Sequence, residues 1–433
     1  MKVQWFIVII IAIKWAYDLV LGLLAEKKRK EPLPSEVSDV YDPERYQKYL
    51  SYVKDNKRAG LVFGIIELAV ECLILFSGIF PLIEKLTDYN VYTTLLLTLL
   101  LFWITESVTE FLDDYYSTFK IEQKYGLNKK TLKEFFKDYF IGRFSTLIFS
   151  CGLSFIIAFI GEHMSVWTDG FSVGWLKALL ISAGIAAAIG LFIVLGQFFS
   201  YRMFRLQYKF TRLPDGELRG KILELQKDSK KKIKEIYVYD ESKKSTTKNA
   251  FLLKMLWHRE FGIADNFINE NSERELLAVL SHETGHLKHK KTFLDVLGYF
   301  FIALLFALVV IFITNPALPL AAVKWVRDSF GLSKNNYYLI ITAVSYAVTP
   351  IMFFISVYSN SNSRINEYEA DAEAVKNGYG EDLIKTFKNL GSDELINVNP
   401  HPVIEFLEYN HPGMYNRIKA ILNGITKQDN HNK

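Results

Sequence analysis

Long apolar stretches alternate with polar segments along the whole chain. Seven of these stretches approach or exceed the roughly 20 residues that a membrane-spanning helix needs. They cover about residues 1–24, 60–81, 91–110, 139–161, 175–198, 292–314 and 337–358. The pattern therefore predicts a multi-pass α-helical membrane protein with seven transmembrane helices.

The two longest polar segments define the other parts of the predicted organisation. Residues 199–291 and 359–433 are too long and too polar to stay in lipid, so both are expected to lie in water. The chain then divides into four parts: transmembrane helices 1–5 with their loops (1–198), a first polar segment (199–291), transmembrane helices 6–7 (292–358) and a C-terminal polar segment (359–433).

The distribution of Lys and Arg predicts the orientation in the membrane. Loop 25–58 contains nine of these residues and loop 111–143 contains seven, whereas loops 82–90, 162–174 and 315–336 contain one, none and three. Because basic loops stay in the cytoplasm, we expect the N-terminus outside, and both long polar segments and the C-terminus on the cytoplasmic side. The first apolar stretch has no small-residue cleavage site, so it is expected to be a retained helix and not a signal peptide.

Four glutamates interrupt the second and third apolar stretches. Glu67 and Glu71 are four residues apart, as are Glu106 and Glu110, so each pair shares one helix face. A lone charge in lipid is costly, and such faces usually line protein interior or a water-filled cavity. We expect this for Glu67 and Glu71. For Glu106 and Glu110 the alternative that they reach the lipid headgroups stays open.

The polar segment 199–291 combines helical and strand-like patterns. The stretch "GELRGKILELQKDSKK" has Leu and Ile at helical spacing, whereas "IKEIYVYD" (233–240) alternates and is rich in β-formers. The short runs "NAFLLKML" and "EFGIADN" are strand-like and are separated by the turn-like "WHRE". A small β-sheet beside the next helix is therefore expected.

That next helix contains the sequence HETGH at 282–286. Positions i and i+4 lie on one helix face, so His282 and His286 can bind one metal ion together. Glu283 occupies the following position, where its carboxylate can accept a proton from a water molecule at the metal. Zinc suits this arrangement because it lowers the pKa of such a water towards neutrality.

Residues near the motif are expected to have other roles. Thr284 and Gly285 are small and would leave room above the metal, and His289 would belong to a solvated basic helix end. The two cysteines, Cys72 and Cys151, lie in apolar stretches and form no CxxC zinc site, so a further ligand must be His or a carboxylate. The net charge of +4 is small and scattered, which does not indicate a nucleic-acid partner.

A third protein ligand is expected, because a catalytic zinc typically has three ligands and a water molecule. The candidates lie beyond the last apolar stretch, in "NSRINEYEADAEAV" (362–375), which has helical character. Glu367 and Asp371 are four residues apart, and so are Glu369 and Glu373. One carboxylate of a pair could bind the metal while the other orients a ligating imidazole. Spacing alone does not choose between the two pairs.

Together with other motifs, these residues resemble the type I CAAX prenyl proteases, which are integral-membrane zinc metalloproteases of the gluzincin group. The resemblance runs from about residue 40 to residue 422. "SRINEYEAD" resembles the family's SRxxExxAD signature, and "TRLPDGELR" (211–219) resembles the segment after its fifth span. "EQKYGLNKKTLKEFFKD" (122–138) is similar to its loop with a GFNK-like run, with Leu127 in place of the usual Phe. "KKSTTKNAFL" resembles the stretch that holds the substrate backbone, and "EYNHPGMYNRI" resembles the C-terminal HPP signature.

The resemblance implies a barrel of seven helices around a large water-filled chamber, closed on the cytoplasmic side by a zinc-metalloprotease domain that contains the small sheet. It selects Glu367 as the third ligand of one zinc ion per chain, and Asp371 as the carboxylate that supports the ligands. It further implies that His411 stabilises the developing oxyanion. Asn249 is implied to hydrogen-bond the substrate main chain beside the scissile bond.

The resemblance also implies that Arg364 and Arg417 support the site. The sequence departs from the family pattern in two other motifs. The HPP signature reads His411-Pro412-Gly413, and the PLFNKF-like run before the PDGEL motif is "RLQYKF" (205–210). We expect these changes to affect substrate selection more than hydrolysis, because the ligands and the general base are all present.

The sequence therefore predicts a zinc-dependent membrane endopeptidase that cleaves membrane-tethered or prenylated (CAAX-type) peptides. The chain is expected to be a monomer in contact with membrane lipid, in the cytoplasmic membrane of a bacterium or the endoplasmic reticulum membrane of a eukaryote. One alternative is a quality-control protease of the bacterial heat-shock type, which usually has fewer spans and a smaller chain. The other is a non-catalytic transporter or lipid-binding protein with a structural metal, for which Glu283 would be unnecessary.

Overall fold

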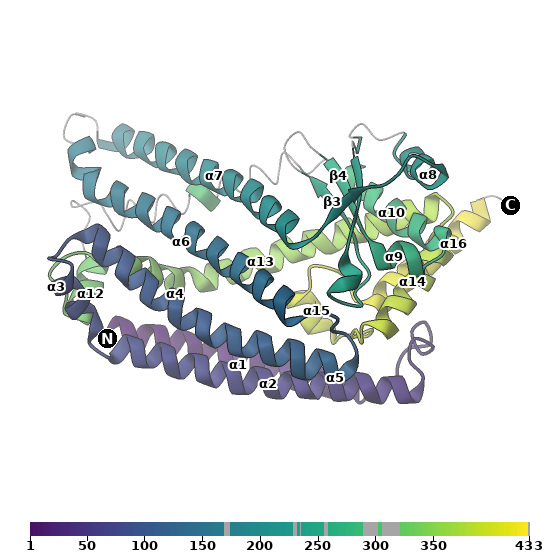
Figure 1. The fold of residues 1–433 in the computed structure, drawn as a ribbon, viewed down its shortest axis with the longest axis horizontal. Helices are drawn as coiled ribbons and strands as arrows, with labels where there is room; N and C mark the ends of the chain where they lie inside the picture. The colour runs from purple at the N-terminus through teal and green to yellow at the C-terminus, as the bar shows by residue number, and fades with distance from the viewer. Residues whose placement is uncertain are drawn as a thin grey trace.

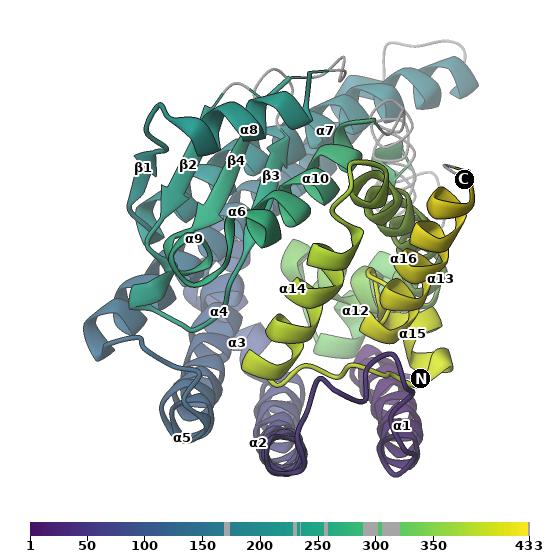
Figure 2. The same ribbon diagram turned by 90° about the vertical axis from the view of Figure 1, so that its right-hand side faces the viewer.

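A computed structural model describes residues 1–168, 174–227, 232–233, 235–254, 259–288, 302–304 and 321–431 of the 433-residue chain. Long helices run side by side along the molecule, and the β-sheet and the C-terminal helices gather at one end of them (Figure 1). The short helices α3 (Ile79–Leu86) and α12 (Ala321–Phe330) lie at the opposite end. Figure 2 looks along the long helices from the end that carries the sheet.

Six long helices build the extended part of the described chain: α1 (Val3–Arg29), α2 (Pro43–Phe76), α4 (Val91–Tyr116), α6 (Leu132–Thr168), α7 (Gly174–Gln207) and α13 (Tyr337–Lys376). Among the described residues, five helices are long and apolar enough to cross a membrane, namely α1, α2, α4 with its continuation, α6 and α13. The chain is thus a multi-pass helical membrane protein. Helix α7 contains the fifth predicted span, whereas the sixth, 292–314, lies almost wholly outside the described residues. The seven-helix barrel and its chamber stay predictions.

The ends of the long helices differ from the ends of the apolar stretches. Helix α2 begins well before residue 60, because the Asp42 side chain accepts a hydrogen bond from the Arg45 N–H at 2.7 Å and Pro43 occupies the first helical turn. Helix α13 continues past residue 358 into a polar sequence up to Lys376. Its last turns bury Ala370 and Ala374 against neighbouring helices, so packing extends the helix beyond the apolar residues.

Of the four glutamates in the apolar stretches, Glu71, Glu106 and Glu110 have partners on other long helices, whereas Glu67 is exposed. The Tyr346 hydroxyl of α13 donates a hydrogen bond to Glu71 at 2.7 Å. Arg143 of α6 forms ion pairs with Glu106 and Glu110 of α4, and only 9% of the Arg143 side chain is exposed. A buried guanidinium needs such carboxylates, but about half of each glutamate side chain stays exposed, so the alternative that they also reach the lipid headgroups stays open.

The small predicted sheet is present and has four strands, in the order β1 (Phe210–Arg212), β2 (Glu235–Tyr239), β4 (Arg259–Ala264) and β3 (Ala250–Lys254). Strands β2 and β4 are parallel, and the two outer pairs are antiparallel. Strand β1 was not predicted from the sequence. Strand β3 is an edge strand, and it begins directly after Asn249.

Shorter helices complete the end of the molecule that carries the sheet. They are α5 (Gln123–Tyr125), α8 (Glu217–Leu225), α9 (Asp265–Glu270), α10 (Glu273–Lys288), α14 (Gly380–Asp393), α15 (Pro402–Glu408) and α16 (Met414–His431), with a π-helical turn at Ser117–Glu122 and a 3-10 turn at Glu241–Lys243. A hydrophobic cluster joins α2 to the C-terminal helices through Tyr49, Tyr125, Leu395 and Ile418. The membrane helices and the C-terminal part therefore share a core.

Candidate metal centre

Helix α10 carries the HETGH sequence and is well defined at its start. Ser272 Oγ and the Ser272 N–H both donate to Glu275 Oε2, at 2.6 and 2.9 Å, and the Glu275 N–H donates back to Ser272 Oγ at 3.3 Å. This reciprocal arrangement is a capping box, which satisfies N–H groups that a helix start leaves free. Leu276 and Leu280 are buried in one cluster with Phe261 and Ile263 of β4. The cap and the apolar face together fix the helix against the sheet.

The structure brings His282, His286 and Glu367 together, with one ligand atom from each lying within 4.8 Å of the others. The Nε2 atoms of the two histidines are 3.2 Å apart. His282 Nε2 lies 3.4 Å from Glu367 Oε2, and His286 Nε2 lies 3.3 Å from Glu367 Oε1. Helices α10 and α13, far apart in sequence, therefore present these three side chains to one point.

The donor set fits a metal ion. Two nitrogen ligands at 2.0–2.1 Å from a tetrahedral zinc lie about 3.3 Å from each other, close to the separation of the two imidazoles. Glu367 Oε2 is buried and has no hydrogen-bond partner among the described residues. A buried carboxylate oxygen without a hydrogen bond is costly, and a cation at this point would compensate it.

Asp371 and Arg417 contact the candidate ligands and restrict their orientation. Asp371 Oδ1 lies 2.8 Å from His282 Nδ1, which leaves His282 Nε2 for the metal. Arg417 of α16 donates to both Asp371 oxygens, at 2.9 Å from Nε and 2.7 Å from Nη2. Its Nη1 is 3.4 Å from Glu367 Oε2, and the guanidinium lies 4.2 Å from the centre of the Phe387 ring. One arginine thus fixes both carboxylates.

The charges around His282 and Arg417 alter their pKa values. Burial disfavours the charged form of His282, but hydrogen bonds to Asp371 and Glu367 outweigh burial and raise its pKa to about 9. Burial likewise lowers the pKa of Arg417, but the charge of Asp371 and its hydrogen bonds raise it above the ordinary value, with smaller effects of Glu367 and Glu283. The carboxylates of Asp371 and Glu367 therefore favour a positive charge between His282 and Arg417.

Gly285 has a different role from the one expected. A Cβ atom at this position would lie 2.7 Å from Ala370 Cα and 3.1 Å from Ala370 Cβ. The space beside Gly285 is thus filled by α13 and is not left open above the metal. Thr284 is also buried, with its hydroxyl donating to the Ser281 carbonyl at 2.8 Å. The glycine allows the close approach of α10 and α13 that brings Glu367 to the histidines.

The structure shows which of the two carboxylate pairs faces the histidines, a question that residue spacing does not answer. Glu367 and Asp371 are buried and face α10, whereas Glu369 is exposed and Glu373 accepts a hydrogen bond from the Asn377 amide at 3.3 Å. Glu283 is half-buried on α10, between the two histidines in sequence. His289, expected to be part of a basic helix end, lies outside the described residues.

His411 lies at the edge of the group, and Arg364 supports the segment before it. His411 Nε2 is 3.5 Å from Glu367 Oε1, and 57% of its side chain is exposed. Arg364 Nη1 donates to the carbonyl oxygens of Glu405 and Tyr409, at 3.0 and 2.6 Å. Arg364 therefore positions α15 and the following loop and does not contact the two histidines of α10.

Gly413, which replaces the second Pro of the HPP signature, is also packed closely. A Cβ atom there would lie 2.7 Å from Pro400 Cγ and 3.0 Å from Glu405 Oε2. In this chain, the Pro400 ring occupies the space beside residue 413. The departure from the family signature thus has a local packing explanation.

Asn249 is exposed at the start of edge strand β3, and its carbonyl accepts a hydrogen bond from the Ala264 N–H at 2.9 Å. The preceding residues are fixed by the loop after α5: the Lys129 N–H donates to the Lys244 carbonyl at 3.0 Å, and the Thr246 N–H donates to the Leu127 carbonyl at 3.2 Å. The loop with the GFNK-like run thus supports the approach to β3.

Some contacts of the site were missed from the sequence. Asn410 Oδ1 lies 2.8 Å from His411 Nδ1, and the Tyr17 hydroxyl of α1 donates to the Glu408 carboxylate. The sequence gives no signal for the second contact, because it joins residues at opposite ends of the chain. A polar residue next to a candidate histidine is the signal that could have found the first.

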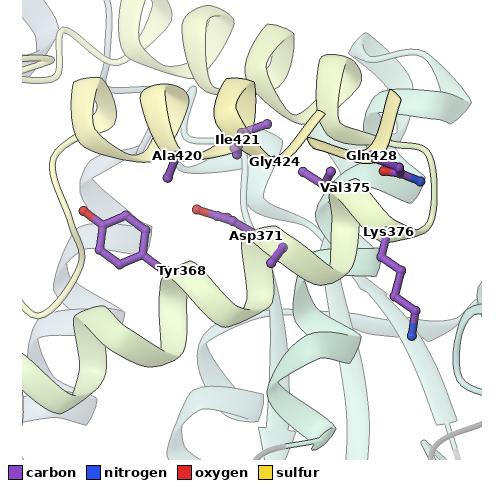
Figure 3. Close-up of a pocket in the computed structure, with 9 residues that line it drawn as sticks. Tyr368, Asp371, Val375, Lys376, Ala420, Ile421, Gly424 and Gln428 are labelled. Atoms are coloured by element: carbon purple, nitrogen blue, oxygen red, sulfur yellow. The ribbon is translucent and has the colours of Figure 1, made fainter. Parts of the chain in front are cut away.

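A hollow lies between α13 and α16, next to Asp371. It has a volume of about 350 Å³ and is lined by Asp371, Val375, Ile421 and Gly424 among others (Figure 3). The residues that line it do not include the two histidines, Glu367 or His411. The hollow therefore lies beside the candidate metal centre, on the side of Asp371.

Comparisons with known proteins identify the family of the chain. Residues 23–195 match the model of the CAAX prenyl protease N-terminal part with five membrane helices, and residues 212–425 match the model of peptidase family M48. The chain belongs to the CAAX prenyl protease family. It is therefore a membrane metalloprotease of the M48 family.

Curated relatives of the family span nearly the whole chain. The CAAX prenyl protease 1 homolog of Arabidopsis thaliana is 27% identical over 90% of both chains. The probable CAAX prenyl protease 1 of Schizosaccharomyces pombe is 28% identical over 96% of this chain and 88% of its own. The crystal structure of Ste24p from S. mikatae has the same fold, with a TM-score of 0.78, 23% sequence identity, and coverage of 97% of this chain and 99% of that one.

Proposed function

We propose that the protein is a zinc-dependent endopeptidase that hydrolyses a peptide bond in a membrane-tethered or prenylated (CAAX-type) substrate. The observation that carries this proposal is the meeting of His282, His286 and Glu367 at one point with a buried carboxylate oxygen that lacks a hydrogen-bond partner among the described residues. The prenylated substrate class is supported by the names of the Arabidopsis and fission yeast relatives.

The side chains of α10 and α13 would divide the chemistry between them. His282, His286 and Glu367 would hold one zinc ion, which supplies a Lewis acid that polarises the scissile carbonyl and lowers the pKa of a water molecule. Glu283 would accept the proton of that water and pass it to the leaving amine. Asp371 and Arg417 would keep the ligands oriented, as their contacts with His282 and Glu367 suggest.

Two exposed residues would act on the substrate. His411 would donate a hydrogen bond from Nε2 to the carbonyl oxygen as negative charge develops on it. Asn249 would hydrogen-bond the substrate main chain while the substrate aligns with edge strand β3. Both side chains are exposed next to fixed backbone, which suits groups that must meet a peptide.

The arrangement in the membrane is part of the same proposal. The N-terminus would lie outside, and the metal centre and the C-terminus would lie on the cytoplasmic side, as the Lys and Arg distribution predicts. Segments 199–291 and 359–433 would close a water-filled chamber formed by the helices of 1–198 and 292–358. A lipid-anchored substrate would then reach the site sideways, between two helices. The enzyme would act as a monomer.

The variant Glu283→Gln tests the mechanism directly. It removes the proton acceptor but keeps the size of the side chain. We therefore expect kcat to fall by about 10²–10⁴-fold with zinc still bound. Cleavage of a farnesylated CAAX peptide by the purified protein, together with zinc per chain measured by mass spectrometry, gives both quantities.

The variant Glu373→Gln is a matched control, because Glu373 lies on the C-terminal turns of α13 and outside the group of ligands. It should keep wild-type activity. Cleavage at wild-type rates by Glu283→Gln would contradict the proposed mechanism. Equal cleavage of the peptide with and without the farnesyl group would contradict the prenylated substrate class.

A further inference from the structure

The backbone of the loop that carries His411 is held in place. Arg364 of α13 binds the carbonyl oxygen of Tyr409, the last residue before Asn410, at 2.6 Å. Asn360, also on α13, donates to the Glu408 carbonyl at 3.3 Å, and Tyr17 of α1 donates to the Glu408 carboxylate. Two helices thus fix the chain just before residues 410 and 411.

The imidazole of His411, by contrast, receives little support from packing. Its side chain is 57% exposed, and its polar contacts within the described part of the chain are with Glu367 and Asn410. The contact at Nε2 is with a proposed metal ligand at 3.5 Å. The shorter contact at Nδ1, 2.8 Å from Asn410 Oδ1, is the one that can set the orientation of the ring.

We propose that Asn410 is a positioning residue for His411, an inference that rests on the oxyanion-stabilising role proposed above. The Asn410 side-chain amide hydrogen-bonds Nδ1 and thereby directs Nε2 towards Glu367 and the place where the scissile carbonyl would lie. An amide can present either its oxygen or its NH2 group to Nδ1, so this contact sets the orientation of the ring while Nε2 faces the developing oxyanion. The exposed ring would otherwise rotate among several orientations, and only one of them serves the reaction.

The test is a double-mutant cycle on the full-length protein in detergent, with a farnesylated CAAX peptide as the probe. Asn410→Ala should lower kcat about 10-fold, with KM and bound zinc within about 2-fold of wild type, because only the orientation of a group used in the transition state changes. Asn410→Asp keeps an oxygen acceptor and should recover most of kcat. In a His411→Ala background, Asn410→Ala should change kcat less than 2-fold.

Matched measurements separate this inference from other effects. Asn56→Ala removes an amide that bonds its own helix at the Tyr52 carbonyl, and it should leave kcat unchanged. The thermal unfolding midpoint of each variant checks that the fold is intact. Leu has nearly the shape of Asn but no polar atoms, so recovery by Asn410→Asp but not by Asn410→Leu supports positioning over a purely structural role.

Several results would overturn the inference, and they are distinguishable. Wild-type kcat in Asn410→Ala, with a large loss in His411→Ala, removes the positioning role and leaves the proposed function intact. Additive losses in the double variant show that Asn410 acts independently of His411. Wild-type kcat in His411→Ala removes the role proposed for His411 and with it the basis of this inference.

Discussion

The two sides of the metal centre are built differently. On the ligand side, His282, Glu367 and Asp371 are buried and joined by Arg417, so each charge has an opposite charge or a hydrogen bond beside it. On the side that would face the substrate, His411 and Asn249 are exposed and project from loops. The backbone of these loops is fixed, but their functional side chains are not packed.

This difference follows from what each side must do. A buried charge is tolerated only when it is paired, so the ligand side needs a closed network and gains rigidity from it. Groups that bind a peptide must leave their hydrogen-bonding atoms free until the substrate arrives. We therefore expect changes on the ligand side to affect metal binding, and changes on the substrate side to affect turnover with the metal in place.

The largest effect should come from Glu367→Gln, because it removes a charged ligand from the buried side. The neutral amide leaves the cation with two imidazoles, and zinc affinity should fall more than about 100-fold, beyond the range for residues that only support ligands. Competition with a chelator of known affinity measures this, and peptide cleavage should be lost in parallel.

Glu369→Gln is the matched control, because Glu369 lies two residues away on the same helix but is exposed. It should bind zinc as the wild type does. If Glu369→Gln lost the metal and Glu367→Gln kept it, the choice between the two carboxylate pairs would be reversed.

A smaller effect on the same side is expected for Asp371→Asn. The amide oxygen can still accept a hydrogen bond from His282 Nδ1–H, but the ion pair with Arg417 is lost, so zinc affinity should fall about 10–100-fold. Arg417 then keeps only the longer ion pair with Glu367, so stability should fall as well, by less than the roughly 3–5 kcal/mol of a fully broken buried pair. Zinc affinity and the unfolding midpoint should therefore fall together.

Asp382→Asn tests whether any broken aspartate–arginine pair has this effect. Asp382 binds Arg274 at 2.7 Å, the same distance as in the pair of Asp371 and Arg417. The Arg274 side chain, however, is exposed to solvent. Exposed pairs contribute about 0–1 kcal/mol, and zinc binding should be unchanged. Equal losses in both variants would break the distinction between the two sides.

The sequence predicted the pair of candidate ligands on α10 but could not choose the carboxylate on α13 by spacing. HETGH places His282 and His286 on one helix face whatever the rest of the fold does. Glu367 and Glu369 are both followed by an acid four residues later, and tertiary packing such as that of Ala370 against Gly285 turns the first of them towards α10. That contact joins distant parts of the chain, so the resemblance to a family was needed to select it.

The membrane helices were predicted with similar limits. Hydropathy marks the apolar middle of each helix, but helix ends depend on caps such as Asp42 and on tertiary packing. Helix α13 continues through a polar sequence because other helices cover it there, which no local pattern indicates. The same reason applies to Tyr17 and Glu408, whose contact spans almost the whole chain.

Glu394 provides a contrast on the substrate side, because this carboxylate accepts a hydrogen bond from a backbone N–H and not from an arginine. Its Oε1 accepts a hydrogen bond from the Lys248 N–H at 3.0 Å, next to Asn249. Burial raises its pKa to about 7, the Lys248 N–H and the Lys248 charge oppose this, and the charges of Asp393 and Glu241 add to it. The loop before β3 therefore rests on a carboxylate that titrates near neutral pH.

The smallest predicted effect is a pH-dependent gain of stability in Glu394→Gln. Because the folded-state pKa of about 7 lies above the ordinary value of 4.5, the neutral carboxyl stabilises the fold below pH 4.5, and this contribution is lost as the pH rises through 7. Gln stays neutral and can still accept the Lys248 hydrogen bond. Its unfolding midpoint should exceed that of the wild type by roughly 2–6 °C at pH 8, and the difference should vanish near pH 4.5.

Glu381→Gln, an exposed change on α14, should show no such trend. A constant difference between Glu394→Gln and wild type at every pH would mean that burial of the Glu394 charge does not weaken this loop, and the substrate side would then be as well compensated as the ligand side.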